Sequence, residues 1–186
     1  MSAVADFASG LFGNGLAARR GGVQPRTVQI ILSNRQRRVR FDVEWLRQFA
    51  AMALAECMRH SGDGLFALKG LPGVEVAVVS DAVIAGVHRK FMNVPGATDV
   101  ITFDHGELVL SADTAKRYAA EHGHGVVEEL ALYVVHGLLH LNGFDDREPK
   151  ARARMHRVQN RVWRGLLAKL AALPKKQPCK VRGEAV

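Results

Sequence analysis

The sequence predicts one α+β domain, a small mixed β-sheet of about four strands packed with about five helices. Short segments rich in β-branched residues alternate with longer segments of helical periodicity, and glycine or proline separates them. One helical segment, residues 126–142, is apolar on nearly every side and must therefore be buried. A chain of 186 residues is long enough for one such core.

The first half of the chain is expected to contain two strands and two helices. Asp42 is a suitable N-cap for the first helix, and Ser80 or Asp81 for the second. The pair Pro95 and Gly96 then interrupts the chain. In chain order we expect a strand at 27–32, a helix from 43 to about 60, a glycine-rich loop at 62–72, a strand at 74–79 and a helix from 81 to about 92.

The second half is expected to begin with a hairpin and to continue with three helices. The residues 104–106 are suited to the hairpin turn, and Pro149 is suited to the first turn of the last helix. The expected segments are strands at 98–103 and 107–110 and helices at 112–122, 126–142 and 149–172. The domain should therefore cover residues 27–172. Residues 1–26 are expected to be a disordered extension, or less plausibly a transit peptide, and 173–186 a basic disordered tail.

The formal charge of +8 comes mainly from the C-terminal fifth of the chain, whereas residues 27–146 carry more acidic than basic side chains. This asymmetry suggests a polyanionic partner, although a solubilising charged helix would produce the same pattern. No apolar run approaches the roughly 18 to 20 residues needed to span a bilayer. The two cysteines, Cys57 and Cys179, lie far apart and imply no disulfide framework, which favours a reducing cytoplasm.

The most informative stretch is HGLLHLNGFDD, which runs from His136 to Asp146. His136 and His140 are four residues apart in a predicted helix, so they share one face and can bind one metal ion. Gly143 can end that helix in the left-handed conformation, and the chain can then present Asp146 as a third ligand. Two imidazoles and a carboxylate with a fourth position open are typical of a catalytic zinc site. We therefore expect one Zn²⁺ per chain.

The same spacing is similar to the motif of metzincin peptidases, which place a glutamate directly after the first histidine as general base. Here that position is Gly137, so peptidase chemistry of this type lacks its base. Asp145 is the nearest acidic substitute and a candidate catalytic residue. It can equally orient a metal ligand or stabilise the turn.

The metal motif resembles that of the YbeY family of endoribonucleases, in which the last ligand is usually a histidine where this chain has Asp146. ATDVITF at 97–103 and GELVLS at 106–111 resemble two further family segments, and the resemblance covers roughly residues 27–172. It implies a zinc-dependent, single-strand-specific endoribonuclease of rRNA processing and ribosome biogenesis in the cytoplasm. Its partners would be ribosomal RNA and ribosomal subunit proteins, with neither DNA nor a membrane expected.

One departure from the family pattern concerns a cation. The family usually has an arginine directly after the aromatic residue where this chain has Met92, and an asparagine near the position of His88. Arg89 precedes Met92 by three residues, so in a helix both side chains lie on the same face. We therefore expect Arg89 to supply the missing charge in catalysis.

The last predicted helix combines a basic stripe with an apolar one. At about 100° per residue the two stripes lie well apart, so one face can pack on the domain while the other presents cations. Arginine binds phosphate oxygens well, and we expect Arg154, Arg157 and Arg161 to bind RNA, although a solvated outer face would look the same. The basic stripe consists of Arg147, Lys150, Arg154, Arg157, Arg161 and Arg164, and the apolar one of Met155, Val158, Val162 and Leu166.

Three classes of function follow from these patterns. A zinc-dependent endoribonuclease is favoured. Another metal hydrolase, such as a peptidase, is the second, and Gly137 argues against it. A non-catalytic, zinc-stabilised factor that binds ribosomes or RNA is the third, and Met92 keeps this alternative open.

Overall fold

The structure is a computed structural model that describes residues 28–64 and 67–172, so the tails expected at 1–26 and 173–186 lie outside the described residues. Its sheet has four strands in the order β1-β2-β4-β3. The strands are β1 Gln29–Asn34, β2 Gly73–Val79, β3 Val100–Phe103 and β4 Glu107–Ser111. β1, β2 and β4 run parallel, whereas β3 pairs with β4 as the expected antiparallel hairpin. The mixed sheet and the α+β class are confirmed.

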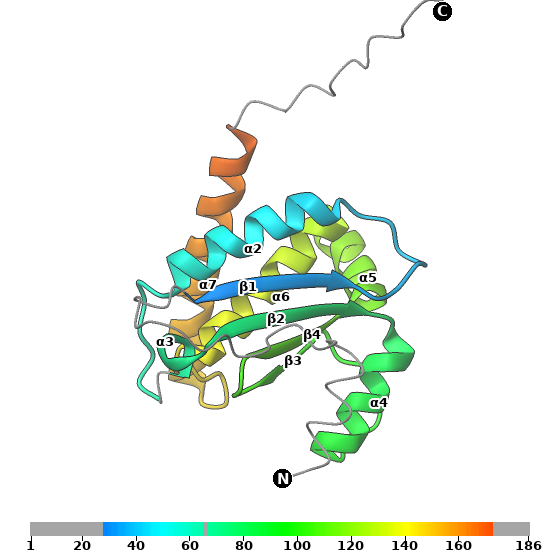
Figure 1. Ribbon diagram of the computed structural model, residues 1–186, viewed down its shortest axis with the longest axis horizontal. Coiled ribbons are helices and arrows are strands. Elements are labelled where there is room, and N and C mark those ends of the chain that lie inside the picture. The colour runs from blue at the N-terminus through cyan, green and yellow to red at the C-terminus, as the bar shows by residue number, and fades with distance from the viewer. Residues whose placement is uncertain (1–27, 65–66, 173–186) are drawn as a thin grey trace, which may run out of the picture.

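Six helices accompany the sheet in the described part of the chain, one more than expected (Figure 1). They are α2 Val43–Cys57, α3 Ala67–Gly70, α4 Asp81–Met92, α5 Ala112–His122, α6 Val126–Leu141 and α7 Pro149–Ala171. The prediction of a loop over 62–72 was wrong at α3. Four residues are too few to produce a helical periodicity, and Leu68, which anchors α3, is fully buried by distant parts of the chain.

The two faces of the sheet contribute to two separate clusters of buried residues. Successive side chains of a strand point to opposite faces. Val76 and Val78 pack with α2, α6 and α7, whereas Ala77 and Val79 pack with Ile84 of α4 on the other face. Figure 1 accordingly shows α4 apart from the other long helices. α6, predicted as the buried helix, contacts α2, α5 and α7 as well as β3 and β4.

α6 approaches the sheet closely at Gly137. A Cβ atom at this position would lie 2.4 Å from Cδ2 of Leu108 and 3.1 Å from Oγ1 of Thr102. Glycine therefore lets the helix rest on the β3–β4 hairpin at this distance, whereas a larger residue would force the buried Leu108 side chain to move. This contact fixes the height of the following turn of α6, which carries His140, above the sheet.

Polar side chains hold the N-terminal ends of α2 and α4 in different ways. The side chain of Asp42 accepts a hydrogen bond from the backbone of Trp45 at 2.9 Å, as expected of an N-cap. Asp81, in the first turn of α4, accepts hydrogen bonds from Ser111 at 2.5 Å and from Arg117 at 2.7 Å, which joins α4 to α5.

No helix in the described ranges combines the length and apolar character needed to cross a membrane.

Candidate metal centre

His136 and His140 lie on one face of α6 near its C-terminal end, as their spacing predicted. Their Nε2 atoms are 2.9 Å apart, and Oδ2 of Asp146 lies 3.8 Å from each of them. One ligand atom from each of the three side chains lies within 4.8 Å of the others, and all three residues are half-buried. The structure thus brings together the three predicted ligands around one point.

The imidazole rings are held so that both Nε2 atoms are available as ligands. Nδ1 of His140 donates to the carbonyl oxygen of Phe144 at 3.1 Å, and Nδ1 of His136 donates to Oε1 of Gln159 at 2.9 Å. Because a carbonyl oxygen can only accept, this bond places the proton of neutral His140 on Nδ1 and leaves the Nε2 lone pair free. Two unprotonated nitrogens facing each other at this distance repel unless a cation lies between them. The donor set therefore fits a metal ion.

Burial and the neighbouring His136 imidazole lower the pKa of His140, although the Asp146 carboxylate opposes this shift. A lowered pKa keeps the imidazole neutral at pH 7, which is the form that binds metal. The electrostatic environment therefore agrees with the orientation set by the hydrogen bonds.

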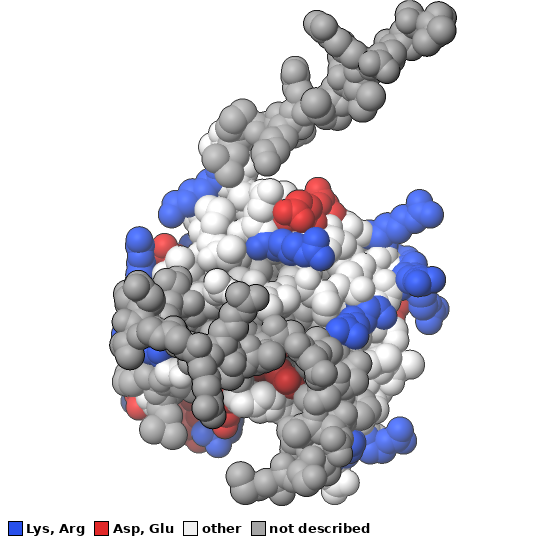
Figure 2. Space-filling view, viewed as in Figure 1, with Lys and Arg blue, Asp and Glu red and all other residues white. Residues whose placement is uncertain are grey.

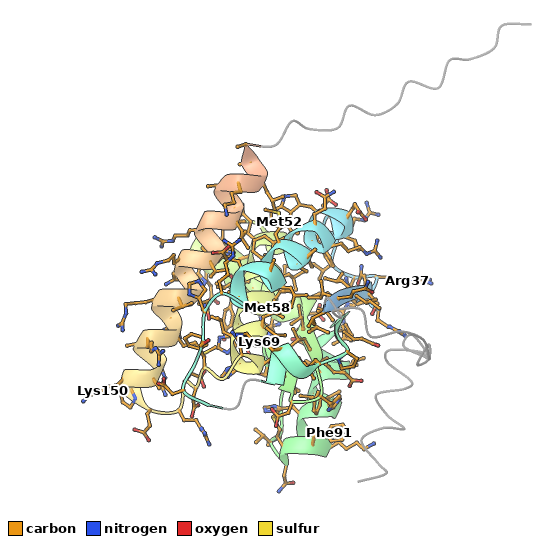
Figure 3. All side chains as sticks on the ribbon, turned by 60° about the vertical axis from the view of Figure 1, so that its left-hand side comes forward. Arg37, Met52, Met58, Lys69, Phe91 and Lys150 are labelled. Carbon is orange, nitrogen blue, oxygen red and sulfur yellow. The ribbon has the colours of Figure 1, made fainter. Side chains whose placement is uncertain are left out.

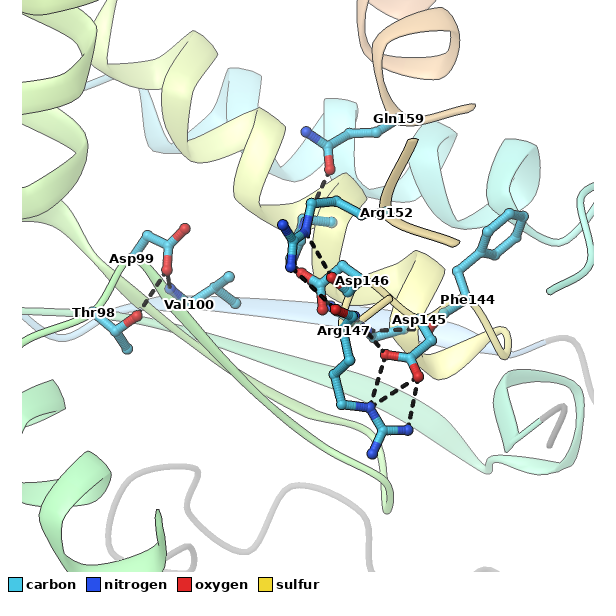
Figure 4. A network of polar contacts seen from close by, with 11 residues as sticks. Thr98, Asp99, Val100, Phe144, Asp145, Asp146, Arg147, Arg152 and Gln159 are labelled. Carbon is cyan, nitrogen blue, oxygen red and sulfur yellow. Dashed lines mark hydrogen bonds and ion pairs between the residues drawn. The ribbon is translucent and has the colours of Figure 1, made fainter. Parts of the chain in front are cut away.

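A tight turn after α6 delivers Asp146. Gly143 has a φ of 82°, the left-handed conformation expected from the sequence, and its N–H donates to the carbonyl oxygen of His140 at 3.0 Å. From α7, Nε of Arg152 donates to the backbone oxygen of Asp146 at 2.7 Å (Figure 4). Asp146, the third predicted ligand, is thus positioned from both sides, by the end of α6 and by the start of α7.

A second loop braces this turn, and no sequence pattern predicted this contact. The N–H of Gly62 donates to the carbonyl oxygen of Asn142 at 3.0 Å, and that of Gly64 to the carbonyl oxygen of Gly143 at 2.9 Å. A Cβ atom on Gly62 would lie 1.9 Å from the Gly143 oxygen, so the two backbones touch. The amide of Asn142 also donates to the carbonyl oxygen of Cys57 at 2.9 Å. Roughly eighty residues separate these partners, and no local pattern could reveal the contact.

The three ligands line a cavity of about 1350 Å³ whose charged side chains are mostly acidic. Two arginines, Arg147 and Arg154, also line it. The carboxylates of the lining belong to Asp63, Asp99, Asp104, Glu129, Asp145 and Asp146. An anionic ligand in this cavity would therefore depend on the charge of a bound cation and on the two arginines.

Among the three arginines predicted to bind RNA, only Arg154 lines the cavity. It is held in place, since it donates to the carboxylate of Asp63 and to the carbonyl oxygen of Ser61 at 3.0 Å. Arg157 and Arg161 are exposed on α7 and do not line the cavity. The apolar stripe of α7 packs into the core, as expected.

Arg89 and Met92, the residue that departs from the family pattern, also lie in different places. Met92, 46% exposed, lines the cavity, whereas Arg89 is exposed on α4 and is not among the lining residues. The lining residues include no cation from α4. The structure thus brings Arg154, but not Arg89, to the wall of the metal cavity.

Asp145 belongs to an ion pair rather than to the metal group. Its two carboxylate oxygens accept hydrogen bonds from Nε and Nη2 of Arg147 at 2.7 to 3.0 Å, and Oδ1 also accepts from the backbone N–H of Arg147 (Figure 4). These hydrogen bonds hold the pKa of Asp145 well below its usual value. The carboxylate is therefore a weak proton acceptor, and its contacts are those of a turn-stabilising residue.

Comparison with known proteins places this geometry in a family context. Residues 31–166 match the family model described as Endoribonuclease YbeY. An Endoribonuclease YbeY of Pelotomaculum thermopropionicum is 32% identical over 148 residues, which cover 72% of this chain and 93% of that protein. The protein of the same name from Mycobacterium ulcerans is 34% identical over 112 residues, which cover 49% of this chain and 63% of the relative.

A solved structure agrees with the fold. The solution structure of the Thermotoga maritima protein TM1509 superposes with a TM-score of 0.53 at 22% sequence identity, over 84% of this chain and 99% of that one. At this level of identity the likeness supports the architecture alone.

Proposed function

The chain belongs to the YbeY family, and on this premise we propose that it is a metal-dependent endoribonuclease that cleaves single-stranded RNA during ribosomal RNA maturation and ribosome biogenesis. The observation that carries the proposal is the convergence of His136, His140 and Asp146 in one large cavity. The proposed setting is the cytoplasm, with ribosomal RNA and ribosomal subunit proteins as partners and without DNA. The proposed functional unit is the domain of residues 27–172.

We take Zn²⁺, one per chain, as the cofactor. Two imidazole nitrogens and one carboxylate oxygen form a ligand set that suits zinc and leaves a position open. Bound there, the ion would polarise a phosphate oxygen and lower the pKa of a water molecule. Gln159 and the Phe144 carbonyl would keep the two imidazoles in the ligating orientation, because they accept the Nδ1 protons.

The chain's own cations would offset the negative charge of the cleaved phosphodiester. Arg154 and Arg147 line the cavity, and preorganised donors of this kind stabilise developing charge. Arg89, one helical turn from Met92, is proposed as a further contributor that reaches substrate beyond the cavity wall. Asp145 is proposed to act through Arg147, which it orients, rather than as a strong general base.

Gly137 argues against the hypothesis that the protein is a peptidase. A glutamate there would place a Cβ atom 2.4 Å from Cδ2 of Leu108, so the general base of the helical peptidase motif would fit only if this buried side chain moved. The second candidate is a metal-stabilised RNA-binding factor without catalysis, and the apolar Met92 on the cavity wall favours it.

Incubation of the purified protein with a structured RNA, with and without a chelator, tests the proposal. Cleavage within single-stranded segments that stops on chelation and returns with added Zn²⁺ is the expected result. The double variant His136→Ala/His140→Ala is the matched control and should neither bind the metal nor cleave. If the wild type binds the RNA but leaves it intact under all metal conditions, the non-catalytic candidate is correct.

The contribution of Arg89 has its own test. Arg89→Ala should lower RNA cleavage at least tenfold while metal content and melting temperature stay unchanged. Met92→Arg should partly restore cleavage in that variant. Equal cleavage by wild type and Arg89→Ala would leave Arg147 and Arg154 as the cations of the site.

A further inference from the structure

We infer that the arginine loop, residues 35–40 between β1 and α2, is a second contact surface for the phosphate backbone of RNA, on the side of the molecule away from the metal centre. The inference rests on the proposed function, since it takes RNA as the substrate. It concerns a surface that the metal centre does not explain.

The charge of the arginine loop is unbalanced. Four of its six residues are arginines, and no acidic residue occurs in the stretch 28–41. Arg37, Arg38 and Arg40 are exposed and have no ion pair or hydrogen bond with the described residues. Arg35 differs, because its Nε donates to Oγ of Ser33 at 3.3 Å. Three cations held close together without an anion repel one another, and a bound polyanion would relieve that repulsion.

The loop is also built rigidly around one buried amide. Gln36 is only 8% exposed. Its Oε1 accepts from the backbone N–H of Val39 at 2.8 Å, and its Nε2 donates to the carbonyl oxygen of Val39 at 3.0 Å and to Oδ1 of Asn34 at 3.0 Å. Val39 is itself buried. A loop pinned at Gln36 and Val39 presents its arginines in a fixed arrangement, so less conformational entropy is lost on binding.

The arginine loop and the metal centre lie on opposite sides of the molecule. The loop follows the C-terminal end of β1, whereas the ligands lie where α6 ends and α7 begins. Figure 1 shows these two regions at opposite sides, and in Figure 3 Arg37 and Lys150, at the start of α7, are likewise on opposite sides. Figure 2 shows Lys and Arg side chains gathered along the edge where the β1–α2 connection lies in Figure 1.

Because the arginine loop and the metal centre lie on opposite sides, only a long ligand can contact both. Opposite sides of a domain of this size are separated by on the order of 30 Å, as the radius of gyration of compact chains implies. A short single strand bound at the metal centre cannot reach the loop, whereas a folded RNA can touch both. The guanidinium groups match phosphate oxygens in geometry as well as charge. RNA phosphates are therefore the ligand that the position and the residue type both favour.

The test compares RNA binding by the full-length protein and two variants with equal charge. The first variant is Arg37→Gln/Arg38→Gln/Arg40→Gln. The control removes three exposed cations that lie outside the arginine loop, on or next to α2, α3 and α7. These are Arg59, Lys69 and Lys169, each changed to Gln. The probes are 2′-O-methyl RNAs, which cannot be cleaved through the 2′-hydroxyl, and gel electrophoresis after each titration checks that they are also not hydrolysed by water. Binding is then measured whether or not the protein is a nuclease.

One probe is an RNA hairpin of about 16 base pairs with a single-stranded tail, which is long enough to span the domain. The other is a single strand of about four nucleotides, which is too short to reach across the roughly 30 Å between the two regions. Affinity is measured by fluorescence anisotropy at several salt concentrations. For the hairpin, the loop variant should flatten the slope of log affinity against log salt by about two units relative to the control. For the short strand, wild type and loop variant should bind equally.

A further variant separates charge from rigidity. Gln36→Ala retains every arginine and should keep the salt slope while weakening hairpin binding by about threefold to tenfold, because the loop must be ordered on binding. Equal salt slopes for the loop variant and the scattered control would overturn the inference, as would binding of vesicles rich in phosphatidylserine that depends on the loop while RNA binding does not. Hairpin binding that depends on the loop, in a protein that cleaves no RNA, would support this surface and refute the proposed function.

Discussion

Gly62 lies against the turn that carries Asp146, the third proposed metal ligand, and its replacement by alanine should disturb stability and metal binding together. The added Cβ atom would stand 1.9 Å from the carbonyl oxygen and 2.0 Å from the carbonyl carbon of Gly143. Both are backbone atoms, so no side-chain rotation can relieve the overlap. Either the loop at Gly62 or the turn at Gly143 has to move, and that turn positions Asp146.

The magnitude follows from the contacts that are lost. Separation of the two backbones would break the hydrogen bonds from Gly62 to Asn142 and from Gly64 to Gly143, each contributing about 1 kcal/mol. Residual overpacking adds about 1 to 3 kcal/mol. The reduced entropy of the unfolded chain offsets about 0.4 to 1 kcal/mol. We expect Gly62→Ala to lower the free energy of unfolding by about 2 to 4 kcal/mol.

Urea denaturation followed by circular dichroism measures this loss, and competition with a chromophoric chelator measures Zn²⁺ affinity. Gly62→Ala should weaken Zn²⁺ binding at least tenfold, since a ligand displaced from the site no longer contributes its bond. Gly70→Ala is the matched control, because a Cβ atom at Gly70 has open space around it and the residue lies in α3. It should leave the metal affinity unchanged.

Two results would refute this reasoning. If Gly62→Ala unfolds at the same urea concentration as the wild type, the backbones of the two loops are not in contact. If the variant loses stability but binds Zn²⁺ with unchanged affinity, the brace supports the fold without positioning Asp146.

Three further predictions concern Asp146, the contact that orients His136, and the polar contact of Asp81 between α4 and α5. Asp146→Ala should lower Zn²⁺ affinity at least tenfold by chelator competition, whereas Asp146→His should retain most of it; the opposite order would show that another residue is the third ligand. Gln159→Leu should lower Zn²⁺ affinity about tenfold without lowering the melting temperature, since His136 loses the acceptor that orients it; unchanged affinity would mean that the bond is incidental. Burial raises the pKa of Asp81, but hydrogen bonds, including that from Arg117, outweigh this and lower it, so its stabilising effect should be present above about pH 4 and be lost at lower pH. Asp81→Asn should therefore destabilise by about 1 kcal/mol at pH 7 in urea melts, with the difference shrinking below pH 4, and a difference independent of pH would contradict this assignment.

Local patterns were enough to predict most helices and strands and the grouping of His136, His140 and Asp146, the three proposed ligands. The spacing of His136 and His140 depends only on helical geometry, and the left-handed Gly143 depends only on the lack of a side chain. Both properties belong to a few neighbouring residues, so they can be read from the sequence. The same holds for the hairpin and for the N-cap at Asp42.

Only the tertiary structure decided which distant residues complete the site. Gln159 orients His136 from another helix, and Gly62 braces the turn after α6 from a loop about eighty residues away. The tertiary structure also brought Arg154, but not Arg89, to the cavity wall. The sequence determined that the three proposed ligands lie together, because helix and turn geometry act over four or five residues. The residues around these ligands could not be predicted from the sequence. Their contacts depend on how α6, α7 and the loop at Gly62, which are distant in the chain, pack together in space.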